Sequence, residues 1–96
     1  MSFDLELKAV AIAQAAKEYA YYERKSSGLG ERFIAALVEG YGTLKQNPFF
    51  QVRKAPYRYL KLRKFPHRLI YEVQGQSVIV YQLRHTKRKS HRKYGP

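Results

Sequence analysis

Four basic residues and one histidine in the second half of the chain are of the types that act on a phosphodiester. They are Lys61, Arg63, Arg68, Arg84 and His85. Cleavage of RNA without a metal ion needs a base for the ribose 2′-hydroxyl, cations that stabilise the charged phosphate, and an acid for the leaving oxygen. Arginine suits phosphate because it presents two parallel N–H groups. If the chain is a nuclease, its candidate catalytic residues are Lys61, Arg63, Arg84 and His85.

The candidate proton-transferring groups also have structural interpretations. His85 stands where a strand is predicted to end, and His67 follows Pro66 at a predicted strand start. Tyr94 comes two residues before the chain end, where chains commonly fray. Glu72 is the only carboxylate among the predicted strands of the second half of the chain, so a Glu/His acid–base pair has one poor candidate. The same cations could instead bind an acidic partner without any reaction.

No metal or cofactor site is predicted. The chain has no cysteine, and its three histidines, His67, His85 and His91, lack the spacing of a zinc site. Gly28-Leu29-Gly30 precedes a predicted helix but lacks the rest of a dinucleotide-binding fingerprint, so we interpret it as a turn between helices. We expect the protein to work with no metal ion and no cofactor.

The net charge of +12 comes from one half of the chain. Residues 1–48 hold six Lys/Arg and six Asp/Glu, whereas residues 49–96 hold 13 Lys/Arg and a single acid, Glu72. Solubilising charge usually mixes both signs, so this asymmetry favours a polyanionic partner, either nucleic acid or an acidic protein segment. No apolar run approaches the roughly 20 residues that span a bilayer, and the N-terminus lacks the features of a signal peptide. We expect no membrane partner and a cytoplasmic location.

Two helices are predicted in the first half of the chain. Apolar residues and alanines recur at spacings of three and four from Ala9, which predicts a helix over 9–25. Gly28 can adopt a positive φ and turn the chain. A second apolar stripe predicts a helix over 29–46, which Asn47-Pro48 ends. Because the connection is short, the helices should form an antiparallel hairpin.

Strands are predicted at the N-terminus and throughout the second half. The signals are an alternation of apolar and polar residues or a high content of β-branched and aromatic residues. They predict strands over residues 3–8, 57–63, 65–74 and 77–84, with a loop over 49–56. In the last strand, Val78 and Val80 are assigned to one face, and Ile79, Tyr81 and Leu83 to the other. A strand that is apolar on both faces is normally interior to a sheet.

The predicted order is β-α-α-β-β-β, which is an α+β fold. The N-terminal strand joins a mostly antiparallel sheet, and the helical hairpin covers one face of it. Two helices can cover only one face. The other face is therefore left for a partner, with four cations nearby: Lys61, Arg63, Arg68 and Arg84.

Four segments of the chain resemble a known family. They are "YYERKSSGLGERFIAAL" (21–37), "NP" (47–48), "RYLKLRKFPHRLIYEV" (58–73) and "VIVYQLRHTKR" (78–88). In this order and spacing they resemble the RelE/ParE superfamily of bacterial toxins, over nearly the whole chain. The Tyr-Tyr-Glu motif, the Phe-Pro-His-Arg-Leu-Ile-Tyr strand and the closing His85-x-x-Arg88 are most similar to the ParE branch, whose members are often called plasmid stabilisation proteins.

The resemblance implies the toxin of a type II toxin–antitoxin pair, neutralised by an acidic antitoxin with which it forms a hetero-oligomer. ParE-like toxins poison DNA gyrase by protein–protein contact and are not nucleases. RelE-like toxins cut mRNA on the ribosome, which would here use Lys61, Arg63 and Arg84. A third hypothesis is a basic nucleic-acid-binding module without toxicity. We favour the ParE-like hypothesis, in which the target meets the last strand and tail through Arg84, His85, Lys87 and Arg88.

The wider set of candidate binding residues serves either the target or the antitoxin. It comprises Arg58, Lys61, Arg63, Arg68, Arg84, His85, Lys87 and Arg88. We expect a single toxin domain over residues 1–88, followed by a basic, flexible tail over 89–96.

Overall fold

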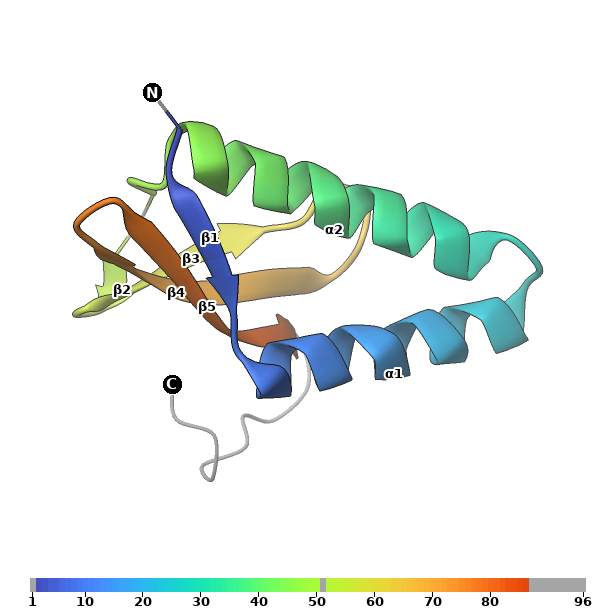
Figure 1. Cartoon of the computed structure of the whole chain (residues 1–96). Coiled ribbons are helices and arrows are strands. Elements are labelled where there is room, and N and C mark those ends of the chain that lie inside the picture. The colour runs from blue at the N-terminus through green and yellow to red at the C-terminus, as the bar shows by residue number, and fades with distance from the viewer. Residues whose placement is uncertain (1, 51, 87–96) are drawn as a thin grey trace.

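The structure, a computed structural model, describes residues 2–50 and 52–86. Its elements, in chain order, are β1 (Asp4–Leu7), α1 (Ala9–Lys25), α2 (Leu29–Gln46), β2 (Val52–Lys54), β3 (Tyr57–Lys61), β4 (His67–Gln74) and β5 (Ser77–His85) (Figure 1). Both helices begin and end at the predicted residues. Lys87, Arg88 and the predicted tail lie outside the described residues.

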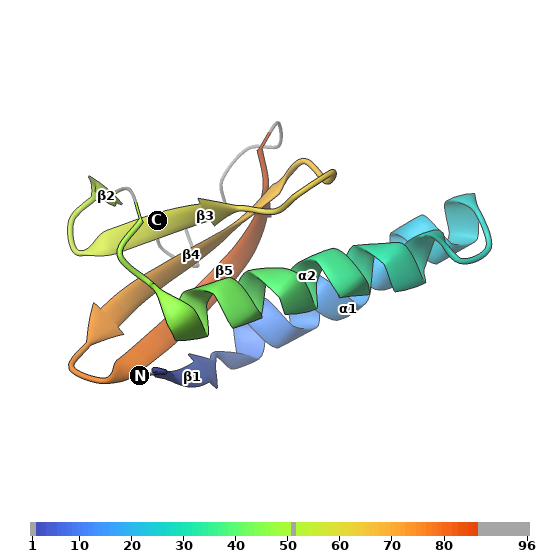
Figure 2. The same cartoon turned by 90° about the horizontal axis from the view of Figure 1, so that it is seen from above.

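The strands form one mixed sheet that the helical hairpin covers on one face (Figures 1 and 2). The strand order is β1-β5-β4-β3-β2. β1 pairs with β5 in parallel, and every other pair is antiparallel. The predicted α+β fold, with its mostly antiparallel sheet, is confirmed. β5 lies between β1 and β4, as its two apolar faces require.

The loop predicted over residues 49–56 is wrong in part, because it contains β2. This strand has three residues and pairs with β3, Val52 opposite Arg58 and Lys54 opposite Tyr57. It lies at the sheet edge, is rich in basic residues and has no alternation, so its sequence carries no strand signal. The order is therefore β-α-α followed by four strands. The strands predicted over 57–63 and 65–74 are each two residues shorter in the structure, as β3 and β4. The chain turns over residues 62–66 between them, where Lys64 has a φ of 67°.

The turn between the helices explains the Tyr-Tyr-Glu and Gly-Leu-Gly motifs. The Glu23 carboxylate accepts hydrogen bonds from the backbone N–H groups of Gly28 and Gly30, both at 2.9 Å. It thereby satisfies free donors at the start of α2 and complements the helix dipole there. Gly28 has a φ of 88°. A side chain at position 30 would meet Glu23 Oε1 and the Tyr19 carbonyl oxygen at 2.8 Å, so glycine lets the helices approach.

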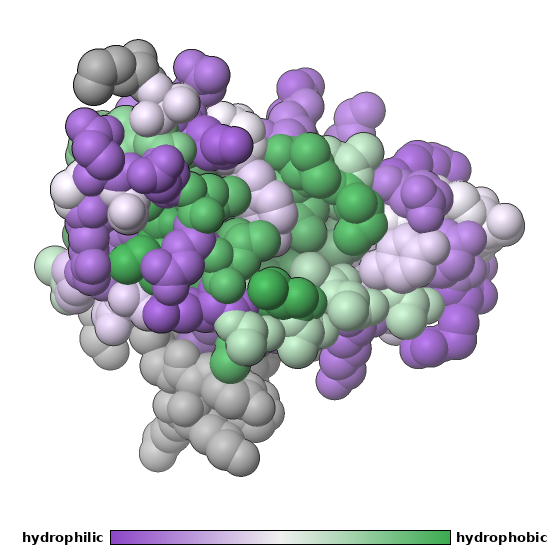
Figure 3. All heavy atoms as spheres, viewed as in Figure 1, coloured by the Kyte–Doolittle hydropathy of each residue, from purple (hydrophilic) through white to green (hydrophobic). Residues whose placement is uncertain are grey.

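The main core lies between the hairpin and the sheet. Its fully buried members include Phe33 and Leu44 from α2 and Leu69, Tyr71, Val78 and Val80 from the sheet. Side chains of this size each contribute about 1.5–3 kcal/mol when they leave water. The buried Tyr71 hydroxyl donates to the Pro48 carbonyl oxygen at 2.8 Å. The space-filling view also shows apolar surface where the helices diverge (Figure 3), and Ile12 and Val38 are among the exposed large hydrophobic residues.

A bulge in β5 changes which residues face the helices. The pairing of β4 with β5 shifts between Ile70, opposite Gln82, and Tyr71, opposite Val80. The extra residue, Tyr81, reverses the alternation beyond it. Leu83 consequently joins Val78 and Val80 in the helix-side core. The predicted grouping of Leu83 with Ile79 and Tyr81 is wrong for this reason.

Candidate functional site: a cationic row on the open sheet face

Three cations lie side by side on the sheet face away from the helices. Lys61 of β3 pairs with Arg68 of β4, and Arg68 pairs with Arg84 of β5. Residues directly opposite on neighbouring strands are close enough for their side chains to interact, and like charges there destabilise the sheet. We call these three residues the cationic row. An anion bound across it would relieve this repulsion.

The row is held in place by neighbours on the same face. The guanidinium carbon of Arg68 lies 5.1 Å from the centre of the Tyr59 ring. Arg84 Nε donates to Gln82 Oε1 at 3.2 Å. Arg68 Nε is buried and finds no hydrogen-bond partner among residues 2–50 and 52–86. A buried donor in this state favours an incoming acceptor.

The pKa of Arg84 is consistent with its position beside another positive charge in the cationic row. Burial lowers the pKa of the Arg84 guanidinium, and the positive charge of Arg68 lowers it further, while Tyr59 acts in the opposite direction. An arginine stays protonated at neutral pH despite such a shift. The row is therefore a partly desolvated set of positive charges, which suits carboxylate or phosphate ligands.

A second group on this face consists of Tyr57, Glu72 and Tyr81. The Tyr81 hydroxyl donates to Glu72 Oε1 at 2.9 Å, and its ring meets that of Tyr57 edge-on at 5.7 Å. Burial raises the pKa of Tyr81 to about 12, and the hydrogen bond and charge of Glu72 add to the effect. Glu72 is therefore engaged with a tyrosine and not with a histidine.

Replacement of Glu72 by glutamine is expected to lower the pKa of Tyr81 towards its ordinary value of 10.0, with burial keeping it above that value. Because the folded state holds this proton more tightly, Tyr81 adds stability below pH 10, and the contribution is lost as the pH rises towards 12. An NMR titration with ¹³C-labelled tyrosine would measure the pKa in both proteins. An unchanged Tyr81 pKa in Glu72→Gln would contradict the assigned hydrogen bond.

Arg58 and Arg63 lie away from the row. Arg58 Nη1 donates to the Phe50 carbonyl oxygen at 2.7 Å, and its guanidinium lies 5.3 Å from the Phe49 ring centre. Arg63 follows the end of β3 and forms an ion pair of 3.8 Å with Glu39 of α2. Their guanidinium groups therefore point towards the loop before β2 and towards the helical hairpin.

His85 lies on the helix side of the sheet, opposite to the row. Its ring is 5.1 Å from that of His67, the residue with which it pairs across β4 and β5. His67 is fully buried, and its Nε2 lies 3.2 Å from Glu18 Oε1 of α1. The structure thus brings Lys61, Arg68 and Arg84 together and places His85 on another surface.

The sequence analysis missed Glu18 and Gln82 as partners of functional interest. The Glu18–His67 contact joins residues 49 positions apart, and no local pattern could have indicated it. Gln82 reaches the open face only because of the bulge. The sequence did show that Glu18 follows Ala11 and Ala15 at helical spacing, on the stripe that is buried in α1, but it did not show the partner of Glu18.

The described part of the chain contains no cluster of three or more His, Cys, Asp or Glu residues able to hold a metal ion. Within the same residues, neither helix has the length and apolarity that crossing a membrane demands.

The chain matches the family of the ParE toxin of the type II toxin–antitoxin system parDE over residues 5–90. It belongs to the ParE toxin family. Nearly the whole chain takes part in this match, including all helices and the row. Among curated proteins, none matches it.

Solved structures similar to this ParE-family chain share its fold. The chromosomal ParDE system from P. aeruginosa superposes with a TM-score of 0.76 at 17% identity, over 90% of this chain and 98% of that one. The RelBE2 toxin–antitoxin complex from Mycobacterium tuberculosis gives 0.61 at 20% identity, over 88% and 99%. A double arginine-to-alanine mutant of E. coli toxin RelE in the free state gives 0.54 at 26% identity, over 91% and 86%.

Proposed function

We propose that this ParE-family protein arrests bacterial growth by binding DNA gyrase through its open sheet face, and that an acidic antitoxin neutralises it in the cytoplasm. The observation that carries the proposal is the family match over residues 5–90. Gyrase inhibition is the activity that the resemblance to the ParE branch implies. The cationic row supplies a surface that a carboxylate-bearing protein could contact.

The position of the histidines favours binding over RNA cleavage. A base for the ribose 2′-hydroxyl must lie within hydrogen-bond reach of the reacting oxygen. His67 is buried against α1, and His85 packs on His67 from the helix side. Neither His67 nor His85 shares the face of Lys61, Arg68 and Arg84, so among residues 2–50 and 52–86 no histidine base lies beside these cations.

The antitoxin partner is supported by charge and by the structural neighbours. Two of the similar structures are toxin–antitoxin systems, one ParDE and one RelBE2. The second half of this chain carries 13 Lys/Arg and one acid. An acidic segment that folds on binding could cover such a surface, giving a hetero-oligomer of toxin and antitoxin.

The alternative function is ribosome-dependent cleavage of mRNA. The row favours it, because three aligned cations beside Tyr59 could hold a phosphodiester and a stacked base. The similarity to E. coli toxin RelE at 26% identity is a second reason to test it.

Induced expression in a bacterium separates these functions. Plasmid supercoiling, gyrase–DNA cleavage complexes and mRNA integrity are measured in the same samples while growth is followed. The gyrase proposal predicts growth arrest with cleavage complexes and intact mRNA. Arrest with codon-phased mRNA cuts would replace it by the nuclease alternative. Growth without arrest would contradict both and favour the basic nucleic-acid-binding module.

A further inference from the structure

The two arginines of the cationic row are in contact with uncharged side chains that orient them. The guanidinium carbon of Arg68 lies 5.1 Å from the centre of the Tyr59 ring, and Arg84 Nε donates to the amide oxygen Oε1 of Gln82 at 3.2 Å. Neither of these two contacts involves a carboxylate. Both therefore orient an arginine without neutralising its positive charge.

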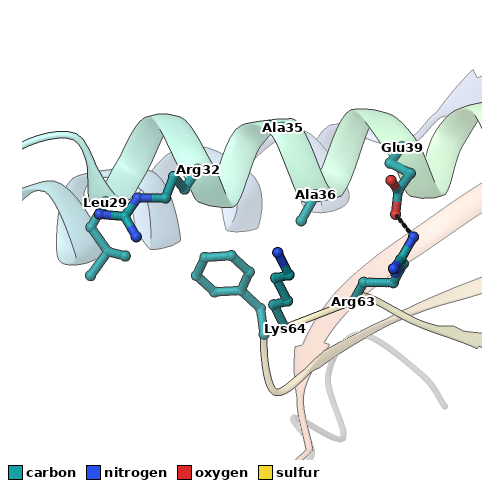
Figure 4. Close-up of a pocket in the computed structure, with 8 residues that line it drawn as sticks. Leu29, Arg32, Ala35, Ala36, Glu39, Arg63 and Lys64 are labelled. Atoms are coloured by element: carbon teal, nitrogen blue, oxygen red, sulfur yellow. Dashed lines mark ion pairs between the residues drawn. The ribbon is translucent and has the colours of Figure 1, made fainter.

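Arg63 shows the other way in which this chain holds an arginine. It lines a pocket between α2 and the turn that joins β3 to β4, where it forms an ion pair of 3.8 Å with Glu39 (Figure 4). Both side chains are more than half exposed, so the pair is weak, but the carboxylate compensates the charge of the guanidinium. Outside the row an arginine meets a carboxylate acceptor, whereas Arg84 in the row meets an amide acceptor.

The bulge in β5 places Gln82 and Arg84 on the same face of the sheet. Gln82 pairs with Ile70 and Arg84 with Arg68, and the extra residue, Tyr81, directly precedes them. Without this extra residue, the alternation would turn both side chains towards the helices. Residues two positions apart on a strand lie about 7 Å apart on one face, which is within reach of long side chains. The hydrogen bond between Gln82 and Arg84 is thus a consequence of the bulge.

Gln82 is buried, so its amide has a fixed position in the open face. It is 1% exposed, and its strand partner Ile70 is 0% exposed. A buried amide keeps its hydrogen bonds because a polar group that is unpaired away from water is costly. Its oxygen restricts Arg84 before any partner arrives, which reduces the conformational entropy lost on binding. A glutamate at position 82 would offer nearly the same shape and would add a negative charge beside Arg84.

We propose that Gln82 is a positioning residue, which orients Arg84 towards a carboxylate of the protein target and leaves the positive charge of Arg84 uncompensated. The inference rests on the proposed function, because it assigns a role at the surface that the target is proposed to contact. The pKa of Arg84 is consistent with it. Burial lowers this pKa, Tyr59 raises it and Arg68 lowers it further, and none of these is a carboxylate.

Replacement of Gln82 by glutamate tests the charge part of the proposal. The new carboxylate would pair with Arg84 inside the face, so binding of an acidic peptide at the row should weaken about tenfold or more. Replacement of Gln82 by methionine tests the orientation part. It keeps the volume and removes the strong acceptor, so binding should weaken about threefold to tenfold.

Gln74→Glu is the matched control. Gln74 is an exposed residue on the same face of β4, six positions from Arg68. It therefore lies about 20 Å away along the strand, well beyond the screening length of about 8 Å at physiological ionic strength. The control introduces the same charge change and should alter binding at Arg84 by less than about twofold.

The experiment is an NMR titration of the full ¹⁵N-labelled chain with a synthetic hexaglutamate peptide, followed at the Nε–Hε signal of Arg84. Urea denaturation first checks that each variant is folded. Slow exchange of the Arg84 Hε with water in the free wild-type protein tests the hydrogen bond to Gln82 without any variant. The proposal predicts slow exchange, a peptide-dependent shift of this signal in the wild type, and weakened binding in both Gln82 variants only.

A purely structural role of Gln82 would leave the peptide affinity of a folded Gln82→Glu protein unchanged, and that result would overturn the proposal. Equal weakening in Gln74→Glu, fast exchange of the Arg84 Hε, or no shift of its signal in the wild type would also overturn it. Growth arrest is not part of this readout. Failure of gyrase inhibition would therefore be seen only in the expression experiment, and failure of the role of Gln82 only in the titration.

Discussion

Replacement of Glu18 by alanine is expected to lower the free energy of unfolding by about 1–3 kcal/mol, because a buried hydrogen bond to His67 is lost. Glu18 and His67 are 7% and 0% exposed, and their side chains meet at 3.2 Å between α1 and β4. Removal of Glu18 takes this hydrogen bond from His67, which is buried beside Tyr22 and Phe33. The free energy of unfolding of a domain of this size is only about 5–15 kcal/mol, so the loss of this contact is expected to be easily measurable.

Urea denaturation at neutral pH measures this effect, with Lys17→Ala as the matched control on the exposed side of the same helix. The double variant Glu18→Leu/His67→Leu separates the lost contact from the cost of burying polar groups. It should recover part of the stability, because apolar replacements of a buried pair are often tolerated. Equal midpoints for Glu18→Ala and Lys17→Ala would show that the contact contributes nothing.

The hairpin was predictable because its signals are local and agree with one another. Alanine-rich periodicity from Ala9, a glycine that adopts a positive φ at position 28, and Asn47-Pro48 each specify one boundary. The alternation over residues 65–74 likewise predicted a strand, and β4 lies within this range. Such features depend only on residues that are close in the sequence.

The remaining features depend on pairing between distant strands. β2 pairs only with β3, and the bulge at Tyr81 is visible only in the pairing of β5 with β4. The sequence identified the basic residues by their type. Their alignment depends on the register between strands, which the sequence did not show. Lys61, Arg68 and Arg84 meet across three strands, while Arg63, two residues from Lys61, turns to Glu39. Residue type alone could not separate these arginines.

If the cationic row is the proposed binding surface, it is expected to lower the stability of the fold. Arg68 and Arg84 are directly opposite on neighbouring strands, a position in which like charges repel. Structural roles alone would favour a neutral or acidic residue at one of the two positions. Retention of both charges is expected where a partner supplies the compensating negative charge, and such sites commonly trade stability for activity.

Replacement of Arg84 by glutamine is therefore expected to abolish growth arrest while leaving the folded protein equally or more stable, by up to about 1 kcal/mol. Arg63→Gln is the matched control, since Arg63 points to the hairpin and its loss should leave growth arrest intact. Growth after induction, gyrase–DNA cleavage complexes and urea denaturation are compared for both variants. Arrest by Arg84→Gln at the wild-type level would exclude the row from target binding. Destabilisation of Arg84→Gln by more than about 1 kcal/mol would instead assign Arg84 a structural role. A residue that serves binding alone is not expected to stabilise the fold.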